Sequence, residues 1–160
     1  MFLIPVEGSA PPMDTRLFLS LLCSLSCALA SEAANPSEIA VNPAALEFAR
    51  QLIQGGRVIW DKKGAWTHDQ PSVRRKTDFL RLRGAEHYGK WHLGIDHRHR
   101  IDTKAHYKFP FGDFANLHRC GLLAAKARAH EYGCADIEAA ATELLQLLDS
   151  IPPSSQKRVD

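Results

Sequence analysis

Apolar residues recur at helical spacing in the first stretch of the chain that is expected to fold. Asn42 is a favourable N-cap, and Pro43 is favoured at the first helical position. The apolar positions that then repeat every three or four residues are Ala45, Phe48, Ala49, Leu52 and Ile53. Gly55 and Gly56 interrupt this pattern. Together these features predict a helix that begins at Pro43 and stops at Gly55.

A second helix is expected after a turn-rich connection that spans residues 57–70. Ser72 follows a proline and can cap this helix. Its apolar residues are Val73, Phe79, Leu80 and Leu82. We expect it to end around Gly84, with a further turn before Gly89.

The period of the pattern changes to two in the middle of the chain. The first alternating run is apolar at Trp91, Leu93 and Ile95, and the second is apolar at Tyr107 and Phe109. A polar link, residues 96–104, joins them, so the pattern predicts a two-stranded hairpin. One face would bury the aromatic side chains, and the other would present His92, His106 and Lys108.

Two further helices are predicted towards the C-terminus. Asp113 is the expected N-cap of a third helix that runs to about Tyr132 and stops at Gly133. One face of it carries small residues, namely Cys120, Gly121, Ala124, Ala125, Ala127 and Ala129. The fourth helix has acidic residues in its first turn and ends at Pro152. Its apolar stripe is Ile137, Ala141, Leu144, Leu148 and Ile151.

The fold class predicted from these elements is mainly α: about four helices and one small β-hairpin in a single compact domain, residues 41–151. Hydrophobic residues make up 45% of the 160-residue chain and charged residues 24%, values that exclude wholesale disorder. Residues 1–36 are expected to be a leader, and residues 152–160 a polar tail.

The leader contains a charge-free, mostly apolar run, residues 17–30. A membrane-spanning helix needs about 20 such residues, so this run predicts no span. Two interpretations stay open: a secretory signal peptide cleaved after Ala30, or a disordered extension of a cytoplasmic protein. The leader itself supports both equally. Cys120 and Cys134 would stand roughly 20 Å apart along a helix, too far for a disulfide, so the folded residues do not require an oxidising compartment. We therefore expect a cytoplasmic location, with secretion as the alternative.

Charge is unevenly distributed although the whole chain carries only +2. Residues 57–108 hold thirteen Lys or Arg against six Asp or Glu, whereas residues 109–151 hold three against six. The predicted basic patch consists of Arg74, Arg75, Arg81, Arg83 and Lys108. It favours a non-enzymatic binding module whose partner is a nucleic acid or an acidic protein. A solvated helix face is the structural alternative.

All eight histidines lie between His68 and His130, and four of them lie in or near the hairpin. His97 and His99 alternate along the link, so their imidazoles can face the same side. The set that could hold a metal is His92, His97, His99 and His106. The sequence predicts no cofactor, and zinc bound by this set for metal-assisted hydrolysis is the alternative.

The remaining candidates for chemistry surround the start of the third helix. Asp113, His118 and Arg119 are expected to form a polar corner cluster that binds an anion or fixes the chain there. His118 and Cys120, two residues apart on one helix, would point to different sides and form no catalytic pair. No catalytic residue is assigned. A homo-oligomer packed through the small face of this helix is the third functional alternative, and the sequence leaves the oligomeric state open.

Five segments carry a resemblance to known proteins: NPAALEFARQLI, YGKWHLGID, TKAHYKFPFGDF, HRCGLLAAKARA and DIEAAATELLQLLD. They resemble a family of small stand-alone bacterial proteins of uncharacterised function, over about two-thirds of the chain. About forty residues also resemble the C-terminal part of tailed-phage head-assembly and maturation proteins. The resemblance implies a compact cytosolic domain and brings no catalytic motif.

Overall fold

The computed structural model describes residues 38–152. The predicted leader and almost all of the predicted tail lie outside these residues. The helices are α1 (Pro43–Gln54), α2 (Trp66–Asp69), α3 (Val73–Gly89), α4 (Arg119–Glu131) and α5 (Ala135–Asp149), with a short 3-10 helix, η1 (Lys104–His106). The strands are β1 (Ile39–Val41), β2 (Val58–Ile59), β3 (His92–Asp96), β4 (Tyr107–Pro110) and β5 (Leu117–His118).

The fold is mixed α/β, so the predicted class, mainly α with one hairpin, is wrong. The described residues form an antiparallel sheet of three strands in the order β1-β3-β4 and a parallel sheet made of β2 and β5. The predicted hairpin is present as β3 and β4, with Ile95 opposite Tyr107. The additional strands are only two or three residues long, so they present no alternation that a sequence pattern can reveal.

Two of the three residues predicted for the polar face of the hairpin, His92 and His106, are buried, and Lys108 is half-buried. His92 is only 3% exposed, and its Nδ1 donates to the backbone oxygen of Tyr88 at the end of α3. His106 is also buried, and its Nδ1 lies 2.8 Å from the backbone oxygen of His99. The end of α3 and the link between the strands therefore cover this face, which the alternation alone assigned to solvent.

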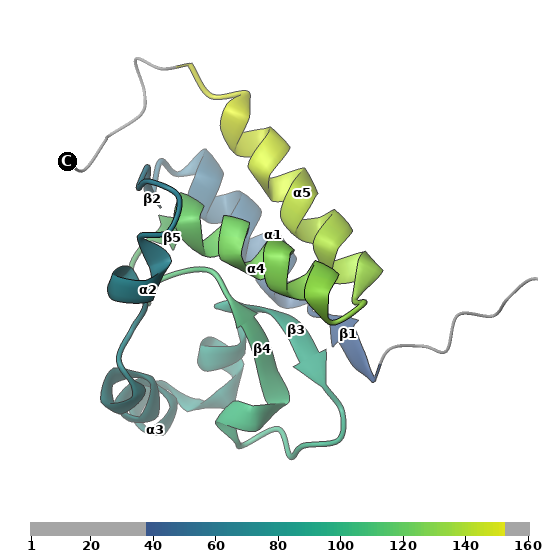
Figure 1. Cartoon of the computed structure of the whole chain (residues 1–160). Helices are drawn as coiled ribbons and strands as arrows, with labels where there is room; N and C mark the ends of the chain where they lie inside the picture. The colour runs from purple at the N-terminus through teal and green to yellow at the C-terminus, as the bar shows by residue number, and fades with distance from the viewer. Residues whose placement is uncertain (1–37, 153–160) are drawn as a thin grey trace, which may run out of the picture. The chain divides into compact units, whose positions relative to one another are not determined.

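Helices α1, α4 and α5 pack against the three-stranded sheet, whereas α3 contacts mainly η1 (Figure 1). The alanine-rich side of α4 faces α5 of the same chain, and Ala125 and Ala129 are buried there. Part of the small face predicted for oligomer contacts is thus buried within the chain, whereas Ala127 of the same face is exposed. The predicted stripe of α5 is buried at Ile137, Ala141, Leu144 and Leu148.

The starts of α1 and α3 agree with the sequence, and the start of α4 does not. Asn42 caps α1 and Ser72 caps α3, whose backbone is non-helical at Gly84. Helix α4 begins at Arg119 and not after Asp113, because Asp113 accepts backbone hydrogen bonds from Ala115 and Asn116 and so caps a turn. This five-residue correction places β5 ahead of α4 and changes where His118 points.

Among the described residues, no helix combines the length and apolar character needed to cross a membrane.

Candidate functional site

The parallel pair of strands β2 and β5 brings together segments that are far apart in the sequence. Ile59 lies opposite His118 in this pair. Asp61 follows β2 by one intervening residue, and Cys120 lies in the first turn of α4, directly after β5. Gly121 allows the first turn of α4 to lie close to the backbone of Phe111. A Cβ added at Gly121 would lie only 2.7 Å from the backbone oxygen of Phe111. The result is one corner that holds Asp61, His118 and Cys120.

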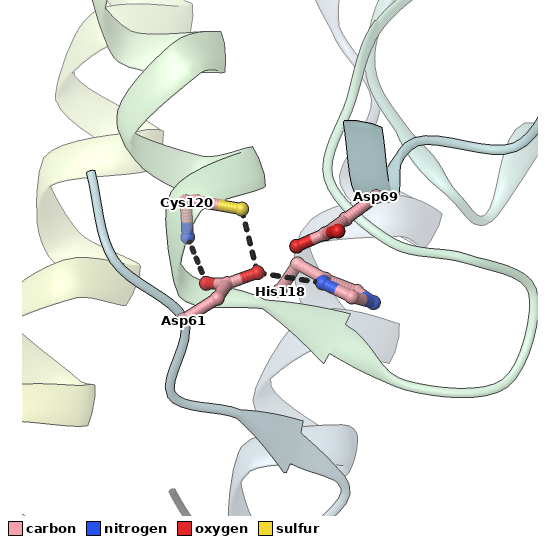
Figure 2. Close-up of side chains that lie close together, drawn as sticks. All are labelled: Asp61, Asp69, His118 and Cys120. Carbon is pink, nitrogen blue, oxygen red and sulfur yellow. Dashed lines mark hydrogen bonds and ion pairs between the residues drawn. The ribbon is translucent and has the colours of Figure 1, made fainter. Parts of the chain in front are cut away.

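Asp61 is the centre of this corner (Figure 2). It is 8% exposed, and its Oδ2 lies 2.7 Å from Nδ1 of His118 and 2.6 Å from Sγ of Cys120. Its Oδ1 accepts a hydrogen bond of 2.7 Å from the backbone N–H of Cys120. Because α4 has no side-chain cap of its own, Asp61 caps that helix from a distant part of the chain.

Asp69 joins the corner from α2 and points its carboxylate towards the other three side chains (Figure 2). One ligand atom from each of Asp61, Asp69, His118 and Cys120 lies within 4.8 Å of the other three. We call these four residues the corner cluster. Asp69 is exposed and the other three are buried, so the corner cluster is closed on one side and reaches solvent on the other.

His118 carries a polar atom without a partner. Its side chain is 8% exposed, and Nε2 is the one buried side-chain nitrogen or oxygen among the described residues that makes no hydrogen bond. Its nearest charged neighbour is Oδ2 of Asp113, at 3.7 Å. Burying such an atom without a bond costs about 1–3 kcal/mol. A buried nitrogen without a hydrogen-bond partner needs an explanation, and a ligand bound nearby would supply one.

The electrostatic environment of the corner is negative. Burial, the hydrogen bond to Asp61 and the charges of Asp61 and Asp69 raise the pKa of the Cys120 thiol far above its ordinary value. Burial alone would raise the pKa of Asp113, but backbone donors from Asn116 and Ala115, with the charges of His118 and Arg75, hold it below its usual range. No lysine or arginine of the described chain forms an ion pair with Asp61, Asp69 or Asp113, so a cation would be stabilised here.

A hollow of about 460 Å³ adjoins the corner cluster. It is lined by Ile59, Asp61, Lys62, Ala65, Asp69, Asp113 and His118. The ring of Trp66 lies 5.6 Å from that of His118 and holds the imidazole in place. The hollow gives a small ligand or an ion a path to the cluster.

The four histidines predicted as metal ligands form no ligand set, although the ring centroids of His97 and His106 lie 6.0 Å apart. His92 and His106 are buried and bonded to backbone oxygens, while His97 and His99 lie exposed in the link. His99 Nε2 lies 3.6 Å from the buried Asp96. Within residues 38–152, the corner cluster is the group of His, Cys, Asp and Glu whose geometry could hold an ion, and it contains none of these four histidines.

The residues of the predicted basic patch come from two elements, α3 and β4. Arg74, Arg75, Arg81 and Arg83 are exposed on α3, and Asp78 lies within 3.8 Å of Arg74 and within 3.6 Å of Arg81. Lys108 lies on β4 and is paired with Asp96 at 3.5 Å. Of the predicted polar corner cluster, Asp113 and His118 lie together, whereas Arg119 lies 3.8 Å from Asp149.

Sequence reasoning did not single out Asp61 and Asp69. Both lie in the connection 57–70, where acidic residues beside Lys62, Lys63 and a glycine are typical of an exposed turn. The 57-residue separation between Asp61 and His118 matches no compact ligand motif. Predicting this contact would have required predicting that β2 pairs with β5. Strands of two residues are too short to show an alternating pattern in the sequence.

Comparison of the chain with protein-family models, with curated proteins and with solved structures found no match.

Proposed function

We propose that the protein binds one transition-metal ion of the Zn²⁺ class through the corner cluster. The observation that carries the proposal is the convergence of four donors in one corner, where His118 is buried and its Nε2 lacks a hydrogen-bond partner. The donors are one imidazole nitrogen, one thiol sulfur and two carboxylate oxygens. Zn²⁺ accepts all three kinds of ligand and prefers four of them in a tetrahedral arrangement.

The distances support an ion of this size. Ordinary zinc bond lengths place neighbouring tetrahedral ligand atoms about 3.4–3.6 Å apart. The contacts from Asp61 to His118 and Cys120 are 2.7 and 2.6 Å, and the widest separation in the cluster is 4.8 Å. Side-chain movements of about 1 Å would therefore convert the hydrogen-bonded cluster into a coordinated one.

Protons occupy the positions that a cation would take. Asp61 Oδ2 accepts from both His118 Nδ1 and Cys120 Sγ, so two hydrogens converge on one carboxylate oxygen. A divalent ion in this place would offset two of the three negative charges of a thiolate and two carboxylates, with which no lysine or arginine of residues 38–152 forms an ion pair.

A competing explanation is a charged imidazolium held between Asp61 and Asp113. It would satisfy both ring nitrogens and needs no ion. It gives no reason for Asp69 to point at Cys120, nor for a buried thiol to share the carboxylate oxygen. Metal binding uses all four side chains, and for this reason it is preferred.

The test is a titration of the metal-free protein with Co²⁺, followed by displacement with Zn²⁺. One equivalent should produce a thiolate-to-cobalt charge-transfer band and tetrahedral visible bands. Cys120→Ser should abolish the charge-transfer band, whereas Cys134→Ser, which alters the other buried cysteine of residues 38–152, should leave it intact. No stoichiometric binding by the wild type, or an unchanged band in Cys120→Ser, would refute the proposal.

We propose as a second candidate that α3 binds the phosphate backbone of a nucleic acid. The observation in its favour is the row of exposed guanidinium groups, of which Arg74 is 94% exposed and Arg81 is 70% exposed. Guanidinium groups match phosphate geometry, and their binding weakens steeply with salt. Asp78 lowers the net charge of this face, and the candidate ranks second for that reason.

Retention on immobilised single- and double-stranded DNA at low salt tests this candidate. Arg74→Ala/Arg81→Ala should elute earlier than the wild type, and Arg128→Ala, on the exposed side of α4, should not. Absence of retention at low salt would overturn it, as would retention on an acidic protein column alone.

A further inference from the structure

The two oxygens of Asp113 have different surroundings. Its Oδ1 accepts backbone hydrogen bonds from Ala115 at 2.9 Å and from Asn116 at 2.6 Å. Its Oδ2 makes no hydrogen bond to the turn and lies 3.7 Å from Nε2 of His118. The turn thus fixes the carboxylate and leaves one oxygen directed at the imidazole.

In the metal-free protein, Asp113 and His118 lie close together without a hydrogen bond between them. His118 Nδ1 donates its hydrogen to Asp61, and a neutral imidazole then has only a lone pair on Nε2. This lone pair faces a carboxylate oxygen, so two acceptors meet without a hydrogen between them. A hydrogen on Nε2 would complete a bond to Asp113, and the turn already holds the acceptor in position.

We infer that Asp113 is the positioning residue of the metal site and selects Nδ1 of His118 as the ligand atom. This inference rests on the proposed metal binding. When Nδ1 coordinates the ion, its hydrogen leaves and Nε2 carries one instead, which it donates to Oδ2 of Asp113. Ligating histidines commonly donate their second nitrogen to a carboxylate in this way, and the partner fixes both ring orientation and tautomer.

The proton balance is simple. The neutral imidazole carries one hydrogen before and after binding, on Nδ1 and then on Nε2. The Nδ1–metal and sulfur–metal bonds form, and the Cys120 S–H bond breaks. One proton leaves to solvent, and no oxidant or further reactant takes part.

Coordination through Nε2 is the opposite arrangement and fits less well. Nε2 faces Asp113, and Figure 2 shows that it points away from Cys120 and Asp69. An ion on Nε2 would leave the thiol and its shared hydrogen bond unused. The position of Asp113 therefore distinguishes the two ring nitrogens.

Asp113→Asn is the sharpest test because it changes one atom in this pair. The asparagine Oδ1 can keep both backbone hydrogen bonds of the turn. Its amide nitrogen replaces Oδ2, donates to the Nε2 lone pair and so stabilises the metal-free tautomer, and it cannot accept a hydrogen from Nε2. We expect the affinity for Zn²⁺ to fall by about 10- to 100-fold, the usual effect of losing such a partner, without loss of metal-free stability.

Asp136→Asn is the control, since it removes the same charge from an exposed position at the start of α5. Imidazole ¹H–¹⁵N NMR supplies a readout that a merely structural role would not move. The zinc-loaded wild type should show a protected Nε2–H of His118, and Asp113→Asn should not.

The outcomes separate the two proposals. A wild type that binds no zinc refutes the metal site itself. A wild type that binds zinc, with equal affinity in Asp113→Asn or with the His118 hydrogen on Nδ1 in the loaded state, overturns the role of Asp113 alone.

Discussion

Oδ2 of Asp61 lies 2.7 Å from Nδ1 of His118, although 57 residues separate them in the chain. The pairing of β2 with β5 produces this contact, since Ile59 is placed opposite His118. The same carboxylate caps α4 through the backbone of Cys120. Asp61 therefore has a structural role in the metal-free protein and a proposed ligand role, and the two can be separated by substitution.

Replacing Asp61 should affect stability and metal binding differently. Asp61→Ala removes the acceptor for the Cys120 backbone and for His118, and should lower the free energy of unfolding by about 1–3 kcal/mol. Asp61→Asn keeps an oxygen for the Cys120 N–H, and its amide can donate to Nδ1 once the imidazole hydrogen moves to Nε2, beside Asp113. We expect it to cost less than about 1 kcal/mol. Urea denaturation of the metal-free variants measures both values.

Both Asp61 variants should bind Zn²⁺ more weakly, because each removes a carboxylate ligand. Equal stability losses for alanine and asparagine would contradict the assigned hydrogen bonds. Unchanged zinc affinity in both would contradict the ligand role.

Zinc binding should release one proton from the Cys120 thiol. Burial and the neighbouring carboxylates raise the pKa of that thiol, so it is protonated throughout the neutral range in the metal-free protein. The apparent affinity should therefore rise about tenfold per pH unit above neutrality. Calorimetry in two buffers of different ionisation enthalpy counts the protons, and a value near zero would show that the thiol is not a ligand.

His92 should make the protein sensitive to acid independently of the metal. Burial, which outweighs the hydrogen bond to Tyr88, lowers its pKa to about 4, whereas an unfolded histidine has about 6.5. The unfolded state thus binds the proton first, so the stabilisation is complete above pH 6.5 and is lost as pH falls towards 4. The slope is about 1.4 kcal/mol per pH unit at most.

Chemical denaturation between pH 7 and pH 4 tests this dependence. His92→Asn, whose amide can still donate to Tyr88, should show a shallower decline than the wild type. His87→Asn, which alters an exposed histidine of α3, should decline like the wild type. Parallel curves for the wild type and His92→Asn would be the contrary result.

The elements that could be predicted from the sequence are those that repeat a pattern over many residues. Helix α1 begins after Asn42 and α5 buries Ile137 and its stripe, as periodicity and capping predict. The pairing of β3 with β4 was also predictable, because both strands alternate. Strands β1, β2 and β5 were not, since two or three residues carry no period.

The start of α4 shows why the site was missed. Asp113 is a good helix cap in any sequence, but here Phe109 and Phe114 adopt positive φ and the chain turns before it becomes helical. His118 therefore lies at a strand end, and both it and Cys120 reach Asp61. Non-glycine residues with positive φ are uncommon, and nothing in their side chains signals the conformation. Binding of a nucleic acid or an acidic protein by the basic residues of α3 stays a prediction.

The most direct measurement is isothermal titration of the metal-free wild type with Zn²⁺, alongside His118→Gln and, as control, His130→Gln, an exposed histidine on α4. The metal site predicts one ion per chain for the wild type and for His130→Gln, and at least a tenfold weaker interaction for His118→Gln. A wild type that takes up no stoichiometric zinc, or a His118→Gln variant that binds it as well as the wild type, would contradict the proposed site.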